Sequence, residues 1–255
     1  MSDRMEGQHV MVTGGAKGIG AAIVRKVLRE GGLASVMDID AAALGAMAHE
    51  TGQAGRLGLF KVDITDLDAL KEAHAQAVAR SGEITALVNN AGRNSYADPV
   101  TMTEEQWEAV FAIDLKAAWY CAKLVLPAMI AQRRGAILNI ASVHADQTFK
   151  GYFPYAAAKS GLVGLTRSLA LEVAEHQVRV NALSPGWTAT ELVRDYLSNA
   201  PAGTLDKVLE VHPMGRIGTP DEVANCAVFL LSDEASFVTG AHWRVDGGIG
   251  ARFAG

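Results

Sequence analysis

The chain has 255 residues, of which 49% are hydrophobic, and its formal net charge is −5 with a pI near 5.8. This composition can build one large α/β domain or two small ones, and an acidic chain without a basic run is a poor binder of nucleic acid. No apolar run approaches the roughly 20 residues that a membrane-spanning helix needs, so we expect neither a nucleic-acid nor a membrane partner.

The chain begins with MSDRMEGQHV, which carries charges where a secretory signal needs an apolar core. The two cysteines, Cys121 and Cys226, lie in helix-like segments, and we interpret them as reduced thiols of a cytoplasmic protein. The other candidate metal ligands show no suitable spacing, so we expect surface residues and no metal site at His49, His74, His176 and His212.

Short apolar segments alternate with helical ones along the first part of the chain. The first predicted strand, 9–13, contains the β-rich sequence VMVT, and glycines within 14–20 turn it into a helix that runs to about residue 31. The same alternation predicts strands at 34–38, 57–62 and 86–89, and helices at 41–51 and 67–80.

A long helix is predicted over 103–132, where Pro127 is expected to kink it or to end its regular part. Strands that are apolar throughout and alternate with helices are typical of a parallel sheet covered on both faces. No linker rich in Pro, Gly or Ser divides the chain, so we predict one α/β domain over 1–255. The remaining elements are predicted as helices at 155–175 and 221–231 and strands at 136–141, 178–183 and 242–245.

The least regular stretch, about 187–214, contains Pro201, Gly203 and Pro213. Such a segment beside a pocket can act as a lid that closes over a substrate. We predict a substrate lid here, and ordinary surface structure is the alternative.

The segment TGGAKGIG, residues 13–20, is the first with recognisable chemistry. Gly14, Gly18 and Gly20 lie between a strand and a helix, where glycines allow a tight turn and a close approach of backbone amides to a phosphate. The amino end of the following helix adds a field that favours negative charge. The spacing differs from G-x-G-x-x-G, and a glycine-rich turn without a ligand is the alternative.

Asp38 ends the second predicted strand, 18 residues after Gly20. A carboxylate at this place can accept both ribose hydroxyls of an adenosine and repels a 2′-phosphate, which favours NAD over NADP. Lys17 argues weakly for NADP, because a cation in the glycine loop attracts that phosphate. The alternative for Asp38 is a cap of the helix that begins near Ala41.

Tyr155 and Lys159 are four residues apart and therefore share one helical face. A free tyrosine titrates near pH 10, and a nearby ammonium stabilises the phenolate form that a general base needs. Ser142 follows a predicted strand and can donate a hydrogen bond to a substrate oxygen. A Tyr/Lys pair at this spacing is also common on solvated helices, so the pair alone does not indicate catalysis.

Taken together, these motifs resemble the short-chain dehydrogenase/reductase family in its single-domain form. The similarity runs from Gly7 to Gly250 and includes the family's usual separation of 13 residues between Ser142 and Tyr155. It also includes NNAG at 89–92 and VTGAHWRVDGG at 238–248. The resemblance implies a Rossmann-like doubly wound parallel sheet, a nicotinamide cofactor, and a homotetramer paired through its long helices, which carry Trp119, Leu124 and Leu165.

The resemblance also implies which residues bind the cofactor. The family contacts adenine at the Asp63-Ile64 position, NNAG supports the sheet beside the cofactor, and NALSPG at 181–186 lies under the nicotinamide. Two threonines after that loop match positions that bind the carboxamide. The implied cofactor-binding residues are Gly14, Lys17, Gly18, Ile19, Gly20, Asp38, Ile39, Asp63, Ile64, Asn90, Ala91, Gly92, Tyr155, Lys159, Pro185, Gly186, Thr188 and Thr190.

One departure concerns the long fourth helix, where the family usually has asparagine in a pattern like N-L-x-G. This chain has IDLKA, with Asp114 at the asparagine position and Ala117 at the glycine. In the family the backbone carbonyl of that residue holds a water linked to the lysine, and aspartate keeps that carbonyl. Asp114 is therefore included with Ser142, Tyr155 and Lys159 as a catalytic residue, and its carboxylate is expected to act on Lys159.

The implied reaction is a hydride transfer between a carbon that bears oxygen and the nicotinamide. In oxidation Ser142 and Tyr155 hold the substrate hydroxyl, and Tyr155 removes its proton as a general base. Lys159 binds the nicotinamide ribose and favours the phenolate. The cofactor carries the redox chemistry, while the protein supplies position and electrostatics.

The substrate is predicted from the segments that line the family's pocket. They place Arg93, His144 and Lys150 around a small molecule, which indicates a polar and partly cationic lining rather than a steroid or acyl pocket. We therefore predict a sugar acid or keto sugar acid, with a neutral aldose or polyol as the alternative. The predicted substrate-binding residues are Arg93, Asn94, Ser142, His144, Lys150, Tyr155 and Trp187.

A non-enzymatic alternative is a protein that senses the redox state of NAD(H) without turnover. Such a protein needs the glycine loop and Asp38 but not the catalytic group. The presence of Ser142, Tyr155 and Lys159 together favours an enzyme.

Overall fold

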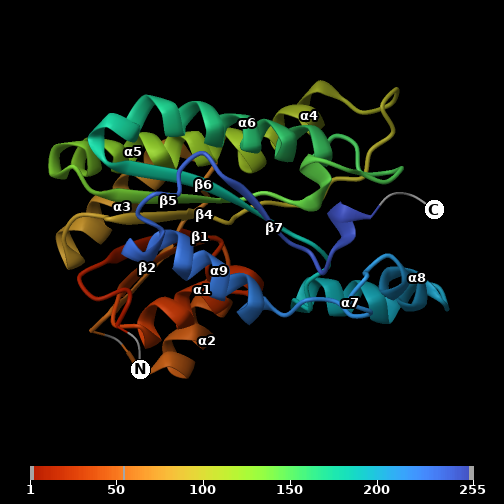
Figure 1. The fold of residues 1–255 in the computed structure, drawn as a ribbon, viewed down its shortest axis with the longest axis horizontal. Helices are drawn as coiled ribbons and strands as arrows, with labels where there is room; N and C mark the ends of the chain where they lie inside the picture. The colour runs from red at the N-terminus through yellow and green to blue at the C-terminus, as the bar shows by residue number, and fades with distance from the viewer. Residues whose placement is uncertain (1–2, 54, 253–255) are drawn as a thin grey trace.

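The computed structural model describes residues 3–53 and 55–252. In this part of the chain a parallel sheet of seven strands has the order β3-β2-β1-β4-β5-β6-β7 (Figure 1). The strands are β1 (His9–Thr13), β2 (Leu33–Asp38), β3 (Leu57–Lys61), β4 (Ala86–Asn89), β5 (Gly135–Ile140), β6 (Val178–Pro185) and β7 (His242–Val245). The order reverses between β1 and β4, and ligands of such sheets bind at the carboxyl ends of the strands on either side of this point.

Helices cover both faces of the sheet. Figure 1 shows α1 (Gly18–Arg29), α2 (Ala41–Thr51) and α9 (Pro220–Leu231) below it, with α5 (Ala117–Gln132) and α6 (Tyr155–Val173) above. Buried residues of α3 (Leu67–Ser81) share a hydrophobic cluster with α5 and α6. The predicted doubly wound parallel fold is therefore confirmed.

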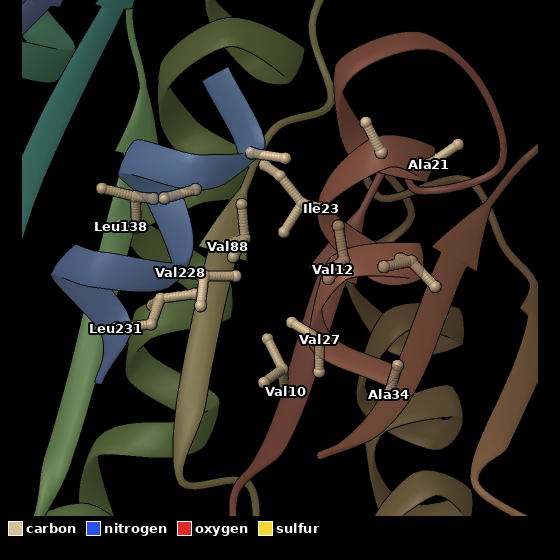
Figure 2. Close-up of a cluster of buried hydrophobic side chains, with 14 of the residues drawn as sticks. Val10, Val12, Ala21, Ile23, Val27, Ala34, Val88, Leu138, Val228 and Leu231 are labelled. Carbon is tan, nitrogen blue, oxygen red and sulfur yellow. The ribbon is translucent and has the colours of Figure 1, made fainter. Parts of the chain in front are cut away.

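The lower core explains why the strands are apolar throughout. Val12 of β1 and Val88 of β4 are fully buried against Ile23 and Val27 of α1 and Val228 of α9 (Figure 2). Met11, the next residue on β1, is equally buried among side chains on the opposite face. Since successive side chains of a strand point to opposite faces, a sheet covered twice needs apolar residues at every position.

The predicted long helix over 103–132 is interrupted, and not at Pro127. It consists of α4 (Glu104–Phe111), a π-helical turn at Ala112–Lys116, and α5, which continues through Pro127 to Gln132. The prediction that Pro127 ends the regular part is wrong. The irregular turn instead centres on Asp114, and π-helical turns frequently occur at functional sites.

The stretch predicted as an irregular lid contains two helices, α7 (Glu191–Asn199) and α8 (Thr204–Glu210). Figure 1 shows them apart from the helices that cover the sheet. No side chain of α7 is buried. A Cβ at Gly18 would lie 3.1 Å from the Thr190 side chain that caps α7, so α7 begins beside the glycine loop. The proposed movement of a lid stays a prediction.

The sequence also gives expectations for the two cysteines, for His212 and for apolar residues of the long helices. Cys121 is buried, Cys226 is half-buried, and both thiols are free. His212 was expected on the surface but is 3% exposed, and its Nδ1 donates to the carbonyl of Val208 at 2.6 Å. Of the apolar residues expected to pair the long helices, Trp119 is 44% exposed, whereas Leu124 and Leu165 are half-buried against the protein's own core, and the homotetramer stays a prediction.

The sequence predicts neither a membrane-spanning helix nor a metal site. Within 3–53 and 55–252, no helix has the length and hydropathy that a membrane span requires. The same residues contain no cluster of three or more His, Cys, Asp or Glu side chains that could hold a metal ion.

A buried chain of amides links the sheet to the helices beneath the site. Asn139 of β5 donates to Thr166 Oγ1 on α6 at 2.8 Å and accepts from Asn89 Nδ2 of β4, also at 2.8 Å. Asn89 Nδ2 additionally donates to the carbonyl of Ala118 at 3.2 Å. Since buried polar groups without partners destabilise a fold, this chain fixes β4, β5 and α6 relative to one another.

We predict that Asn139→Ala lowers the free energy of unfolding by about 1–3 kcal/mol, because Asn89 loses a buried acceptor. Denaturant unfolding at equal protein concentration measures this difference. Asn199→Ala serves as the control, since its bond to the carbonyl of Asp195 is exposed and should contribute within about 0.5 kcal/mol. An Asn139→Ala protein as stable as the wild type would contradict the prediction.

Candidate functional site

The glycine loop leaves no room for side chains. A Cβ at Gly14 would lie 2.8 Å from Cα of Ala91, and a Cβ at Gly20 would lie 2.6 Å from Asn90 Nδ2 and closer still to the carbonyl oxygen of Gly14. Asn90 Nδ2 holds this loop by donating to the carbonyls of Thr13 and Gly14 at 3.1 and 2.8 Å. The loop after β4 thus fixes the shape of the turn after β1.

This turn suits a phosphate group. Lys17 is the N-cap of α1, and its side chain makes no capping hydrogen bond to the first helical turn. The first turn of a helix has backbone N–H groups without helical partners, and its dipole favours an anion. A dinucleotide pyrophosphate therefore fits the open amino end of α1, with Gly18, Ile19 and Gly20 as the nearest residues.

Asp38 is bound to the same loop. Its Oδ2 accepts from the backbone N–H of Ala16 at 2.9 Å, and its Oδ1 accepts from that of Asp40 at 3.0 Å. The cap of α2 is Asp40, which accepts from the N–H of Ala43 at 3.0 Å, so Asp38 does not have the capping role. Asp38 is half-buried and Ile39 is 62% exposed beside it.

Lys17 is neutralised by a second carboxylate. Its Nζ lies 2.7 Å from Oδ2 of Asp40, and this contact holds the pKa of the Asp40 carboxyl below its usual value. The cation that argued for a 2′-phosphate is therefore already paired in the protein. The carboxylates of Asp38 and Asp40 and the ammonium of Lys17 together give this corner of the site, at the end of β2, a net negative charge.

Further along the same edge of the sheet lie Asp63 and Ile64. Oδ1 of Asp63 accepts from the N–H and hydroxyl of Thr65 at 2.9 and 2.7 Å, while the Ile64 side chain is buried. A carboxylate held next to an apolar side chain can contact both the amine and the face of an adenine ring.

Ser142 and Tyr155 begin two successive structural elements. Ser142 directly follows β5 and Ala141 and is the N-cap of a short 3-10 turn, where its Oγ accepts from the N–H of His144 at 3.2 Å. Tyr155 is the first residue of α6, and its ring centroid lies 5.6 Å from Nζ of Lys159. The ammonium is thus near the phenol ring and can stabilise negative charge on its oxygen.

Lys159 is buried, with 5% of its side chain exposed. Its Nζ donates to the carbonyl of Ile140 at 3.3 Å and lies 3.2 Å from Oδ1 of Asp114. The structure therefore pairs Lys159 directly with the carboxylate that occupies the family's usual asparagine position. This contact replaces the neutral neighbour implied by the resemblance.

Asp114 has only partial compensation for its burial. Oδ1 also accepts from the N–H of Arg93 at 3.2 Å, but Oδ2 has no hydrogen-bond partner among the described residues. Burial raises the pKa of the Asp114 carboxyl above its usual value, despite the opposing effect of the Lys159 ammonium. A Cβ at Gly92 would lie 3.0 Å from Nζ of Lys159 and even closer to Oδ1 of Asp114, so the pair requires glycine there.

The segment after β6 completes the proposed cofactor site. Pro185 ends β6, and a Cβ at Gly186 would lie 2.9 Å from Cα of Asp246. The Thr188 hydroxyl donates to the carbonyl of Gly186 at 3.0 Å, and Thr190 accepts from the N–H of Val193 at 3.3 Å. Both threonines therefore lie in the segment that connects β6 with α7.

The substrate side of Ser142 is lined by aromatic rings. His144 stacks on Tyr152 with ring centroids 4.0 Å apart, and its ring lies 5.8 Å from that of Tyr155. Its Nδ1 is 2.9 Å from the hydroxyl of Thr148. Tyr152 in turn meets Tyr96 edge to face at 5.1 Å.

His144 is not one of three converging cations. Burial lowers its pKa to about 4, so the imidazole is neutral at pH 7. The expectation that Arg93, His144 and Lys150 all present positive charge is therefore wrong for His144. A ring held between Tyr152 and Tyr155 loses the water that would solvate an imidazolium.

The remaining predicted substrate residues are more exposed. Arg93 lines a hollow of about 330 Å³ together with Tyr96 and Asp98. Asn94 donates to the Tyr96 hydroxyl at 2.9 Å, and Lys150 is exposed with no ion pair found in the described chain. The other predicted residue, Trp187, packs against Tyr196 of α7 at 5.9 Å between ring centroids.

Three residues of this site are not indicated by the motifs of the sequence: Tyr96, Tyr196 and Asp40. Asp40 precedes the first residue of a predicted helix, and that position is typical of an N-cap. Tyr96 lies two residues after Asn94, and nothing in its local pattern indicates a contact with Tyr152. The bridge between Tyr96 and Pro154 and the hydrogen bond from the N–H of Ala97 to the carbonyl of Phe153 bring these segments together.

The geometry can be compared with known proteins. Residues 14–250 match a family model described as enoyl-(acyl carrier protein) reductase. The chain is 38% identical to 3-oxoacyl-[acyl-carrier-protein] reductase FabG of Thermotoga maritima, over 96% of this chain and 99% of that protein. It is 35% identical to 2-(S)-hydroxypropyl-CoM dehydrogenase 3 of Xanthobacter autotrophicus, over 98% of this chain and all of that protein.

A solved structure gives the same result for the fold. Levodione reductase superposes with a TM-score of 0.92 and 28% sequence identity, covering 98% of this chain and all of that chain. The named relatives are oxidoreductases, and their similarity extends along the whole sheet rather than over the glycine loop alone.

We predict that Asp114→Asn gains stability relative to the wild type as the pH rises from 4 to 7. Because burial raises the pKa of Asp114 in the folded state, its contribution to stability is complete below the unfolded value of about 3.9. That contribution is lost as the pH rises through the folded pKa, and the asparagine variant lacks this loss.

Urea unfolding of both proteins across this pH range measures the difference. The exposed Asp195→Asn variant of α7 is the control and should follow the wild type. A difference between wild type and Asp114→Asn that is constant with pH, or that shrinks as the pH rises, would refute the prediction.

Proposed function

The chain belongs to the short-chain dehydrogenase/reductase family and acts as an oxidoreductase on CH–OH or keto groups; we propose that its cofactor is NAD(H) and that its substrate is a small polyhydroxylated ring. The observation that carries this proposal is the loop after β4, where Asn90 donates to the carbonyl of Gly14 in the glycine turn and Gly92 lies against Lys159 of α6. The non-enzymatic redox sensor is not supported, because the similar proteins named above are enzymes.

When bound, the nicotinamide cofactor supplies or accepts the hydride. In the proposed oxidation, Ser142 donates a hydrogen bond to the substrate oxygen, and Tyr155 takes the hydroxyl proton as a general base. Lys159 stabilises the phenolate form in which Tyr155 accepts that proton, and in reduction Tyr155 donates the proton from its neutral phenol. The Asp114 carboxylate draws the Lys159 ammonium towards itself at 3.2 Å and so moderates that stabilisation.

The preference for NAD(H) rests on the charges at the end of β2. Asp38 faces the glycine loop through its bond to the N–H of Ala16, and Asp40 neutralises Lys17 at 2.7 Å. A 2′-phosphate at this corner would meet two carboxylates and an ammonium that is already paired with one of them. A ribose hydroxyl can instead donate to Asp38.

We predict that kcat/KM with NAD⁺ exceeds that with NADP⁺ by at least about 10²-fold, since a like-charge contact at a binding site costs several kcal/mol. Asp38→Asn should reduce the ratio of kcat/KM with NAD⁺ to kcat/KM with NADP⁺. Asp40→Asn, which frees Lys17 and keeps Asp38, should raise NADP⁺ use while leaving NAD⁺ use nearly unchanged. Wild-type protein that prefers NADP⁺ would overturn the cofactor assignment.

The catalytic assignment predicts that Tyr155→Phe reduces turnover by about 10²–10⁴-fold, the usual contribution of a general acid or base. NADH binding, followed by fluorescence titration, should remain within about twofold, because the phenyl ring keeps its packing. Near-normal turnover in this variant would mean that another group moves the proton.

The substrate class is inferred from the wall of His144 and Tyr152. His144 is neutral and only 9% exposed, and one face of its ring is covered by Tyr152 at 4.0 Å. Its Nε2 edge can bond a substrate hydroxyl, while the half-buried Tyr152 ring can pack against the apolar face of a sugar or other hydroxylated ring. The geometry therefore favours a neutral aldose or polyol in cyclic form.

A sugar acid or keto sugar acid is the second candidate. Arg93 lines the hollow that also contains Tyr96 and Asp98, and no ion pair of the Arg93 side chain is found in residues 3–53 and 55–252. Asp146 does not oppose it, because its Oδ2 binds Arg244 at 2.7 Å. Arg93 and Lys150 are thus the cations left to bind a carboxylate.

A screen with NAD⁺ over aldoses, polyols, hydroxy acids and matched sugar acids tests both candidates, with NADH absorbance as the readout. We predict a higher kcat/KM for the neutral member of each matched pair. His144→Phe keeps the stacked ring and should lower kcat/KM for the polyhydroxylated substrate about five- to tenfold through the lost hydrogen bond.

A deoxy analogue that lacks the bonded hydroxyl provides the control and should be insensitive to His144→Phe. The second candidate is supported instead if acids are the better substrates and Arg93→Met selectively removes their advantage. Equal effects of His144→Phe on both analogues would show that the imidazole does not bind a hydroxyl.

A further inference from the structure

The carboxyl ends of three strands meet behind Ser142. The Ser184 hydroxyl, near the end of β6, donates to the main-chain carbonyl of Ser142 at 2.8 Å. On its other side this hydroxyl lies 2.6 Å from Nε2 of His242, in β7. Ser184 is fully buried and the His242 side chain is 8% exposed, so water competes little with these bonds.

The two short contacts of the Ser184 hydroxyl determine which ring nitrogen of His242 carries the proton. A carbonyl cannot donate, so the single proton of Ser184 goes to Ser142, and His242 must then donate from Nε2 to Ser184. Burial lowers the pKa of His242, Asp146 opposes this effect, and Arg167 and Arg244 add to it, which leaves the imidazole neutral at pH 7. The hydrogen bonds therefore select the Nε2–H tautomer.

The same strand also holds the other end of the turn that begins at Ser142. Arg244 lies two residues after His242 on β7 and contacts Oδ2 of Asp146 at 2.7 and 2.9 Å. Its Nη1 donates to the carbonyl of Gly250 at 2.9 Å, which fixes the guanidinium. The turn from Ser142 to Asp146 is thus tied to β7 at both ends.

We propose that His242 is a positioning residue that orients the Ser142 hydroxyl towards substrate, acting through Ser184 on the Ser142 carbonyl. The 2.6 and 2.8 Å contacts fix the main chain at the residue whose Oγ is to bind the substrate oxygen. An error of about 1 Å in such a contact can cost on the order of 10²-fold in rate. This proposal rests on the proposed function, because it assigns His242 a role through Ser142.

His242→Ala should lower kcat/KM about 10- to 100-fold for the best substrate of the NAD⁺ screen. Ser184 directly precedes the proposed cofactor residues Pro185 and Gly186, but its hydroxyl and His242 bond towards Ser142, so NADH binding should stay within about twofold. His242→Gln, whose amide can donate to Ser184 from a similar place, should recover most of the loss. Trp243→Phe is the control on the same strand, because Trp243 stacks on Phe229 instead, and it should behave as the wild type.

The decisive comparison repeats His242→Ala in a Ser142→Ala background. If His242 acts through the Ser142 hydroxyl, its removal there should cost less than about threefold. An equal loss in both backgrounds, or no recovery in His242→Gln, would overturn the proposal and leave His242 with a general structural role.

A second readout does not depend on turnover. Nitrogen NMR of the wild-type protein should show His242 as the neutral Nε2–H tautomer at pH 7. The Nδ1–H tautomer would refute the network. A wild-type protein with this tautomer but no activity over the whole screen would instead contradict the proposed function and leave the network intact.

Discussion

The Lys159 ammonium lies almost entirely out of water, next to the phenol that it has to influence, and much of the site follows from that constraint. A buried charge needs partners, and here they are the carbonyl of Ile140 and the carboxylate of Asp114. Placing that carboxylate on Lys159 coincides with the π-helical turn that separates α4 from α5. Glycine at position 92 is required because any side chain there would collide with the pair.

Hydrogen bonds also hold the loops on the proposed cofactor side in a close-packed arrangement. The turn after β1 is held by Asn90 and by the hydroxyl of Thr13, which accepts from the N–H groups of Asn90 and Ala91 at 3.1 Å. Beneath it, Asn139 joins β5 to α6, the helix that carries Tyr155 and Lys159. Because Asn89 and Asn90 are consecutive residues, the end of β4 connects the glycine turn after β1 with the hydrogen bonds that reach α6.

The residues predicted to bind substrate make contacts that sequence patterns do not reveal. His144 looks like a cation in the chain, yet stacking on Tyr152 and burial make it neutral. Asp146 lies between two pocket segments, yet Arg244 of the distant strand β7 binds it. His212, expected on the surface, packs under α8 through the carbonyl of Val208. In each case burial or a contact that the local sequence pattern does not indicate decides the charge or position of the side chain.

The amino-acid sequence by itself determined the parallel α/β fold and the family. Apolar strands between amphipathic helices have few alternatives, and the glycine turn and the Ser142, Tyr155 and Lys159 spacing are local patterns. It predicted most strand ends within one or two residues, but it missed α7 and α8, two short helices whose side chains are largely exposed and which lie among the Pro and Gly residues of an irregular stretch. Only the tertiary structure decided that Asp114 pairs with Lys159, that Asp40 neutralises Lys17, and that β7 supports Ser142 through Ser184. These are contacts between residues tens of positions apart, and their geometry and desolvation exist only once the sheet has brought the strand ends together.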